Sequence, residues 1–345
     1  MFLFPSLFPP YFSLYQSHDF CHVNTPILTA NDAEGAGETF RLSPIKSRHP
    51  DATSPVTSRP LPPSDFFSTP AFLTVSHQLH LEALATALAR VYTISPCFRA
   101  EPSDTGRHLA EFWMLEAEWA FPSPDGVQGV CNLAEALLRD TVTEIFKRGE
   151  DINLLLTDAS EPKRTALTDT FSPSVPWTHM TYTDAIKELE NASSSAAACF
   201  TYKPEWGRSL QSEHERWLAE TLVRGPVFVT DYPASLKPFY MRVNADGKTV
   251  ACFDLLVPHV GEIIGGSLRE ERHDVLEAKM REIGLIGGDV GKESGYQWYL
   301  DLRRDGGAPH AGFGMGFERL ISWLSGIDNV RECIPMPRWP GRMLL

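Results

Sequence analysis

Hydrophobic and polar residues alternate along the chain with two different periods, and these periods predict both helices and strands. Apolar residues three or four positions apart predict helices over residues 76–92, 127–147, 268–283, 296–304 and 317–325. Short runs rich in Val, Ile, Phe and Tyr, bounded by turn residues, predict strands over residues 22–28, 93–101, 111–121, 227–230, 239–243 and 249–256.

The order of these elements predicts the fold class. Strands and helices mix without the regular strand-helix-strand alternation of a parallel sheet. Polar turns at 102–106 and 244–247 join neighbouring strands into hairpins. We therefore predict an α+β fold, a mainly antiparallel β-sheet flanked by helices. Stretches rich in Pro, Ser and Thr predict exposed connectors over about residues 43–70 and 158–175.

Composition narrows the class of protein. Of the 345 residues, 43% are hydrophobic and 22% are charged, a balance typical of a folded domain with a sizeable core. No apolar run reaches the length of about 18 residues that a membrane span needs, so no membrane contact is expected. The net charge of −13 argues against binding polyanions through overall charge, so any nucleic-acid contact must be local. The six cysteines have no metal-binding spacing, which favours a reducing compartment without structural metal.

The predicted hairpin over residues 93–121 carries an unusual set of side chains. Alternate residues of a strand share a face, so Arg99 and Glu101 are expected to point the same way, as are Phe112 and Glu116. Arg107 and His108 lie near the hairpin tip. Each of these side chains alone would also fit a solvated strand face. Together they suit a triphosphate, its metal and its base.

A second segment, at 312–316, has glycine at every other position and precedes Phe317, Glu318 and Arg319. Neither common phosphate-binding loop motif is present in the chain. One interpretation is a glycine turn packed against the core. The other is that small residues let a flat ligand approach the backbone, while Arg319 projects from the helix start toward an anion or an aromatic face.

These segments together resemble the class II aminoacyl-tRNA synthetases, and among them most of all the asparaginyl-tRNA synthetases. The stretches that carry the resemblance are 25–28, 34–38, 72–82, 98–112, 261–269 and 312–319. The similarity predicts a class II synthetase catalytic domain over residues 18–345, after an atypical N-terminal segment over 1–17. Members of the family normally begin with an OB-fold anticodon-binding domain, which we expect to be absent from this chain. Of the family's first motif, only the strand around Pro26 is recognisable, and that motif builds the dimer interface.

The resemblance implies an ATP site. Arg99 would hold the amino-acid carboxylate and the α-phosphate, and with Arg319 it would form the catalytic pair. Glu101 would contact the adenine amino group, while Phe112 and Arg319 would cover the two faces of the base. The β- and γ-phosphates would meet Arg107 and His108. Asp254 and Glu262 would hold Mg²⁺, a hard cation that prefers carboxylate and phosphate oxygens.

The resemblance also implies a site for asparagine, in which Arg269 would grip the side-chain end and Glu34, Gln78 and Glu116 would surround the substrate. Aspartyl enzymes have a lysine where this chain has Leu81. Asparagine and aspartate have nearly the same shape, so charge must separate them, and Glu116 would accept from a carboxamide while repelling a carboxylate. His77 stands where these enzymes usually have a glycine, which could crowd the pocket.

The expected partners are asparagine, ATP, tRNA(Asn) and, if the first motif is complete, a second copy of the chain. One alternative is an asparagine synthetase related to these enzymes, which would combine aspartyl-adenylate with ammonia; Leu81 counts against it. Another is an inactive, truncated interaction protein, against which Arg99, Glu262 and Arg319 argue. The similarity to bacterial-like and organellar forms suggests the mitochondrial matrix. The cytoplasm is the alternative, because no Lys or Arg precedes Arg41, whereas mitochondrial presequences contain arginines.

Overall fold

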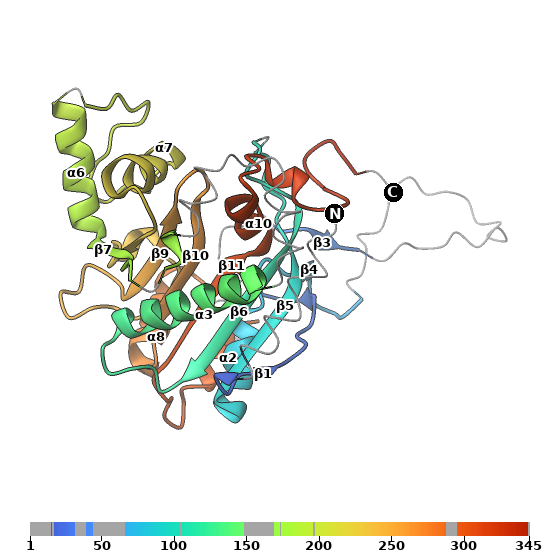
Figure 1. Cartoon of the computed structure of the whole chain (residues 1–345). Coiled ribbons are helices and arrows are strands. Elements are labelled where there is room, and N and C mark those ends of the chain that lie inside the picture. The colour runs from blue at the N-terminus through green and yellow to red at the C-terminus, as the bar shows by residue number, and fades with distance from the viewer. Residues whose placement is uncertain are drawn as a thin grey trace, which may run out of the picture.

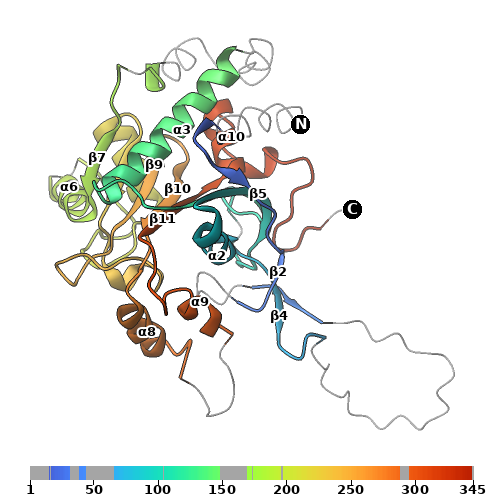
Figure 2. The same ribbon diagram turned by 90° about the horizontal axis from the view of Figure 1, so that it is seen from below.

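The computed structural model describes residues 15, 17–31, 39–43, 66–103, 105–147, 169–172, 174–195, 197–287 and 295–343. Most of both predicted connectors, and the glycine-rich loop with Glu34, lie outside the described residues. Within these ranges the strands form one eight-stranded sheet and one three-stranded sheet (Figures 1 and 2).

The large sheet is mainly antiparallel, as predicted. Only β1 with β5 and β7 with β8 pair in parallel among its described strands. In spatial order, its strands are β1 (Cys21–His22), β5 (Arg90–Phe98), β6 (Glu111–Ala120), β11 (His310–Gly316), β10 (Gly261–Leu268), β9 (Cys252–Val257), β8 (Val227–Thr230) and β7 (Thr178–Thr181).

Helices cover both faces of this sheet (Figure 2). One face carries α3 (Val127–Lys147) and α10 (Phe317–Ser325). The other face carries α2 (Gln78–Leu88), α8 (His273–Glu282) and α9 (Gln297–Asp301). At the β7 end lie α6 (Tyr182–Ser194) and α7 (Ser212–Arg216), and α7 runs directly into a π-helix, Trp217–Val223 (Figure 1).

The small sheet adjoins the end of β5. Its strands are β2 (Leu28–Thr29), β4 (Ala71–Leu73) and β3 (Arg41–Leu42). The backbone of Thr74, just after β4, accepts a hydrogen bond from the N–H of Phe98 and donates one to the carbonyl of Ile27. Two short 3₁₀ helices, Ala234–Leu236 and Val330–Glu332, complete the described elements.

Successive side chains of β6 point alternately into the core and toward the opposite face of the sheet. Leu115, Ala117 and Trp119 point into the hydrophobic core beneath α3 and α10. The intervening Glu116 and Glu118 therefore project from the other face. This face of the sheet becomes the floor of the site described below.

Several elements follow the sequence prediction closely. The structure places α3, β8 and α10 at the predicted bounds. The predicted hairpin is present, but its first strand runs over Arg90–Phe98 instead of 93–101, so Arg99 and Glu101 follow the strand and are not part of it. The predicted strand at 239–243 is wrong: this segment makes only isolated bridges, between Met241 and Arg269 and between Val243 and Val250. The predicted helix at 268–283 begins too early, because Leu268 is the last residue of β10 and α8 starts at His273.

The glycine segment at 312–316 is part of β11 and not a turn. Its glycines alternate on the face opposite to Phe313 and Met315, and they pair with β6. A Cβ atom on Gly312 would overlap the carboxylate of Glu118. Side chains of β6 fill the space above Gly312 and Gly314, which explains the small residues there and which the sequence pattern alone does not show.

Among the described residues, no helix combines the length and the apolar character that crossing a bilayer would require.

Candidate active site

Two adjoining pockets lie over the face formed by β6, β11 and β10. Both pockets are lined by Arg99, Met114, Glu262 and Gly314. The first pocket also contains the predicted residues Glu101, Arg107, His108, Phe112 and Arg319. The second also contains the predicted residues Gln78, Glu116, Asp254 and Arg269. The fold thus brings together all the described residues predicted for the ATP, amino-acid and metal sites. Pro26, predicted for the dimer interface, lies apart on the surface.

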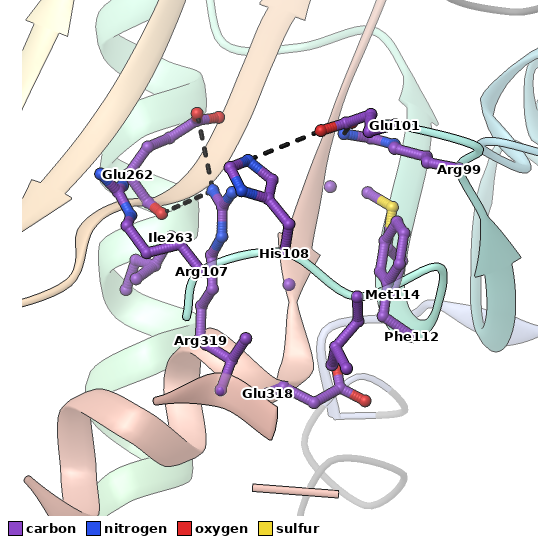
Figure 3. Close-up of a pocket in the computed structure, with 14 residues that line it drawn as sticks. Arg99, Glu101, Arg107, His108, Phe112, Met114, Glu262, Ile263, Glu318 and Arg319 are labelled. Atoms are coloured by element: carbon purple, nitrogen blue, oxygen red, sulfur yellow. Dashed lines mark hydrogen bonds and ion pairs between the residues drawn. The ribbon is translucent and has the colours of Figure 1, made fainter. Parts of the chain in front are cut away.

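The first pocket has cationic side chains on two sides (Figure 3). Glu101 lies between Arg99, at 4.0 Å, and His108, at 3.5 Å. The guanidinium carbon of Arg99 lies 5.2 Å from the ring centroid of Phe112, a cation-π distance. Burial lowers the pKa of His108, although Glu101 opposes the shift. The imidazole is therefore neutral at pH 7, while the arginines provide the positive charge.

Arg319 enters the first pocket from the first turn of α10. Its Nη1 donates to the backbone carbonyl of Glu262 at 2.9 Å and lies 3.7 Å from the Glu262 carboxylate. Burial would raise the pKa of Glu262, but Arg319 and Lys237 outweigh it and lower the pKa below its ordinary value. Glu262 is therefore an ionised group at the boundary of both pockets.

Arg107 is anchored by a residue that sequence reasoning missed. Its Nη2 donates to Oε2 of Glu215, on α7, at 3.0 Å. The same Glu215 oxygen accepts from the backbone N–H of Glu262 at 3.4 Å. Glu215 therefore ties the hairpin tip to the start of β10. A lone glutamate on a polar helix gives no sequence signal for this contact, which spans 108 positions.

The second pocket is organised around Glu116, whose carboxylate is buried. Oε1 accepts from the Ser76 hydroxyl at 2.5 Å, and Oε2 accepts from the backbone N–H of His77 at 2.9 Å. Both donors precede α2 directly. The carboxylate is thus held in one orientation by neutral donors.

The His77 side chain does not crowd the pocket. Its Nδ1 lies 2.7 Å from the Thr25 hydroxyl, and its Nε2 lies 3.2 Å from the carbonyl of Pro96. The ring is fully buried and is not among the residues that line either pocket. Histidine is tolerated here because both ring nitrogens find partners behind the site.

Arg269 lines the second pocket together with Glu116, and its guanidinium is fixed by neighbouring side chains. Its Nε and Nη2 donate to one oxygen of Glu118, the former at 2.8 Å, and its Nη1 donates to the Ser267 hydroxyl at 2.6 Å. The guanidinium also lies 5.3 Å from the ring centroid of Tyr240. Glu118 therefore neutralises Arg269 and aims it. Sequence reasoning missed Glu118, which lies two positions from Glu116 on the same strand face.

A buried polar network supports Gln78 at the other side of the pocket. Gln78 donates to Glu82 at 3.0 Å, and Glu82 has no exposed surface. Glu82 also accepts from the side chains of Tyr299, Arg303 and His310. Burial would raise the pKa of Glu82, but Arg303 and His310 outweigh it and hold the pKa well below its usual range.

The two predicted metal ligands flank one glycine. A Cβ atom on Gly265 would lie 3.0 Å from Oε1 of Glu262 and 3.6 Å from Oδ1 of Asp254. Two carboxylates on one side of a sheet can hold a hard divalent cation. Asp254 has a second partner that was not predicted, because Lys237 Nζ lies 2.8 and 2.7 Å from its two oxygens.

The mainly antiparallel sheet, with an arginine-bearing hairpin and a second arginine entering from α10, defines the catalytic domain of a class II aminoacyl-tRNA synthetase. The family model for class II tRNA synthetases (D, K and N) matches residues 11–340, and the chain belongs to this family.

Two curated relatives of this chain are asparagine–tRNA ligases. The chain is 47% identical over 328 residues to an asparagine–tRNA ligase of Syntrophobacter fumaroxidans, covering 95% of this chain and 66% of the relative. It is 48% identical over 333 residues to an asparagine–tRNA ligase of Rhodopirellula baltica, covering 95% and 63%. The chain therefore spans slightly less than two thirds of the length of these two relatives.

Solved structures agree with the assignment of the chain to the class II tRNA synthetases. Asparaginyl-tRNA synthetase from Pyrococcus horikoshii, complexed with asparaginyl-adenylate, superposes with a TM-score of 0.79 at 32% identity, covering 98% of this chain and 68% of that chain. The Entamoeba histolytica enzyme in complex with asparaginyl-adenylate gives 0.78 at 28% identity, covering 99% and 67%.

Proposed function

We propose that the protein is an asparagine–tRNA ligase. It would join asparagine to ATP, giving asparaginyl-adenylate and pyrophosphate, and pass the asparaginyl group to the 3′ end of tRNA(Asn). The observation that carries the proposal is that Arg99 lines both pockets. An amino acid in one pocket and ATP in the other would meet at this guanidinium. The asparagine–tRNA ligases among its relatives support the choice of amino acid.

The chemistry in the first pocket would be electrostatic. Arg99 would hold the asparagine carboxylate against the α-phosphate and stabilise the charge that develops as the carboxylate attacks phosphorus. No protein nucleophile is needed. Phe112 and Arg319 would enclose adenine, and Glu101 would accept from its amino group. His108 and Arg107 would donate to the outer phosphates.

The second pocket would select the amide over the acid. Glu116 receives hydrogen bonds from Ser76 and His77, which leaves oxygen lone pairs free to accept from a carboxamide NH₂. An aspartate carboxylate at the same place would meet a like charge. Arg269, already neutralised by Glu118, would donate to the amide oxygen without adding net positive charge that would attract aspartate.

Magnesium belongs to the proposal as a partner of the phosphates. Asp254 and Glu262 would hold it, because their carboxylates converge beside Gly265. When bound, the ion would offset negative charge on the phosphates.

A homodimer is also part of the proposal. Pro26 is exposed, and beside it Ile27 and Leu28 are 37% and 47% exposed, which suits a surface that a second copy covers. Gel filtration of the purified chain tests this point, and elution as a monomer would contradict it.

Asparagine-dependent exchange of labelled pyrophosphate into ATP tests the activation step. We expect asparagine to drive exchange at least about tenfold better than aspartate, and Arg99→Ala to abolish it. Arg281→Ala is the matched control, because Arg281 is an exposed arginine on α8. Undiminished exchange in Arg99→Ala would refute the mechanism, and equal exchange with aspartate would favour an ammonia-dependent synthetase. Acylation of a tRNA(Asn) transcript tests the second step.

A further inference from the structure

A buried ion pair stands at the position predicted for a metal ligand. Lys237 directly follows the 3₁₀ helix Ala234–Leu236 and extends to Asp254 on β9. Its Nζ lies 2.8 Å from Oδ1 and 2.7 Å from Oδ2, so one ammonium engages both carboxylate oxygens. The two side chains are only 16% and 14% exposed.

The surroundings of this ammonium keep it in place. Its Nζ lies 4.0 Å from the ring centroid of Tyr232, which is buried beneath it. Lys237, Asp254 and Glu262 line the second pocket together. The ammonium therefore lies between an aromatic face and the carboxylate that a divalent ion would need.

We propose that Lys237 is the resident counter-cation of Asp254, which excludes divalent metal from this carboxylate until a nucleotide arrives. The nucleotide and the metal are those of the proposed function. When metal and triphosphate enter together, Lys237 releases at least one Asp254 oxygen, and its ammonium remains in the pocket beside the phosphates. Lys237 thus controls when Asp254 can bind the metal, and it is a charge partner for the nucleotide.

The Lys237 ammonium and a divalent metal ion compete for the Asp254 carboxylate. A carboxylate at this depth without a partner would be costly, so the nucleotide-free protein needs a cation beside Asp254. Lysine suits this role because it is a point charge on a flexible chain and can change partner by rotation. Magnesium sheds its water reluctantly, so it displaces the ammonium only when phosphate oxygens add to its ligands.

A purely structural ion pair would behave differently. Its loss would lower stability without changing metal affinity. Release of Asp254 from a competing ammonium would instead raise the affinity for a divalent ion in the absence of nucleotide. Metal binding to the nucleotide-free protein therefore separates the two roles.

Mn²⁺ binding to the full chain, followed by the electron paramagnetic resonance signal of the free ion, provides the test. Without nucleotide, we expect Lys237→Met to bind Mn²⁺ at least about tenfold more tightly than wild type. The gain should disappear in Lys237→Met/Asp254→Asn. Lys248→Met, which removes an exposed lysine from a nearby turn, should match wild type. Equal Mn²⁺ affinity in Lys237→Met and wild type would overturn the proposal.

A second comparison applies if Lys237→Met does not fold. Asp254→Asn should leave nucleotide-free Mn²⁺ binding within about twofold of wild type, and should weaken it at least about tenfold when a non-hydrolysable ATP analogue is present. Weaker Mn²⁺ binding by nucleotide-free Asp254→Asn would overturn the proposal. The nucleotide-free measurements need no turnover, so they give an answer even if asparagine-dependent exchange fails.

Discussion

Replacing Glu82 by glutamine should destabilise the fold more than any surface change of the same kind. The side chain is fully buried on α2 and accepts hydrogen bonds from Gln78, Tyr299, Arg303 and His310. Glutamine keeps the size of the side chain but removes the charge that faces Arg303. Arg303, itself buried, would keep only neutral acceptors such as the carbonyl of Glu270.

The expected loss of stability follows from the burial of both Glu82 and Arg303. Removing one partner of a buried ion pair costs about 3–5 kcal/mol, because the other charge stays uncompensated. An unfolding entropy of about 2.1 cal/mol/K per residue amounts to about 0.7 kcal/mol/K for 345 residues, so the melting temperature should fall by roughly 4–7 °C at pH 7. The pKa of Glu82 lies well below its usual range in the fold. The stabilisation from this carboxylate is therefore present above its ordinary pKa and is lost as the pH falls below it, so the difference between the two proteins should shrink on acidification.

Thermal unfolding followed by circular dichroism measures this difference. The matched control is Glu277→Gln, which removes a carboxylate that lies 2.6 Å from Arg281 on the surface of α8. An exposed pair of this kind contributes at most about 1 kcal/mol. If Glu82→Gln melted at the same temperature as Glu277→Gln at pH 7, the argument from burial would be refuted.

Three further changes test other parts of the site. Gly312→Ala should destabilise the fold by about 1–3 kcal/mol in thermal unfolding, because its Cβ would overlap Glu118. Gly225→Ala is the control and should not destabilise the fold, because there is open space around Gly225. Equal effects of the two substitutions would contradict the packing argument. Burial raises the pKa of Glu318 to about 7, so its stabilising protonated form is lost as the pH rises through that value. Glu318→Gln should then melt above wild type at pH 8.5 but not at pH 5, and a difference independent of pH would contradict this. Glu116→Gln should reduce the preference for asparagine over aspartate in pyrophosphate exchange at least about tenfold, and an unchanged preference would remove Glu116 from selection.

The sequence predicts those elements whose pattern is set by their own core contacts. Helix α3 has a long apolar face, and its predicted bounds agree with the structure. Strands β10 and β11 were not predicted, because glycine residues interrupt the alternation of hydrophobic residues along them. The need for glycine at 312 arises from Glu118 on a neighbouring strand, and such a requirement is visible only after the strands pair.

The candidate site, too, could be predicted from the sequence only in part. The hairpin residues could be grouped from sequence, because they lie on two neighbouring segments joined by one polar turn. The shared strand face predicted for Arg99 and Glu101 is wrong, since β5 ends at Phe98. The partners that fix the site come from distant segments: Glu82 and Arg303 are 221 positions apart, and Arg107 and Glu215 are 108 apart. No local spacing encodes these contacts. They follow from the order of the strands in the sheet.

Among the described residues, the positions of the cations explain why the carboxylates of the second pocket have different roles. Three acids line the second pocket. Asp254 pairs with Lys237, and Glu262 lies near Arg319, so each already has a positive partner. Glu116 is held by the Ser76 hydroxyl and the His77 backbone instead. Its negative charge is therefore the one that a ligand can still complement. A group with N–H donors and no negative charge, such as a carboxamide, meets that requirement, whereas a second carboxylate does not.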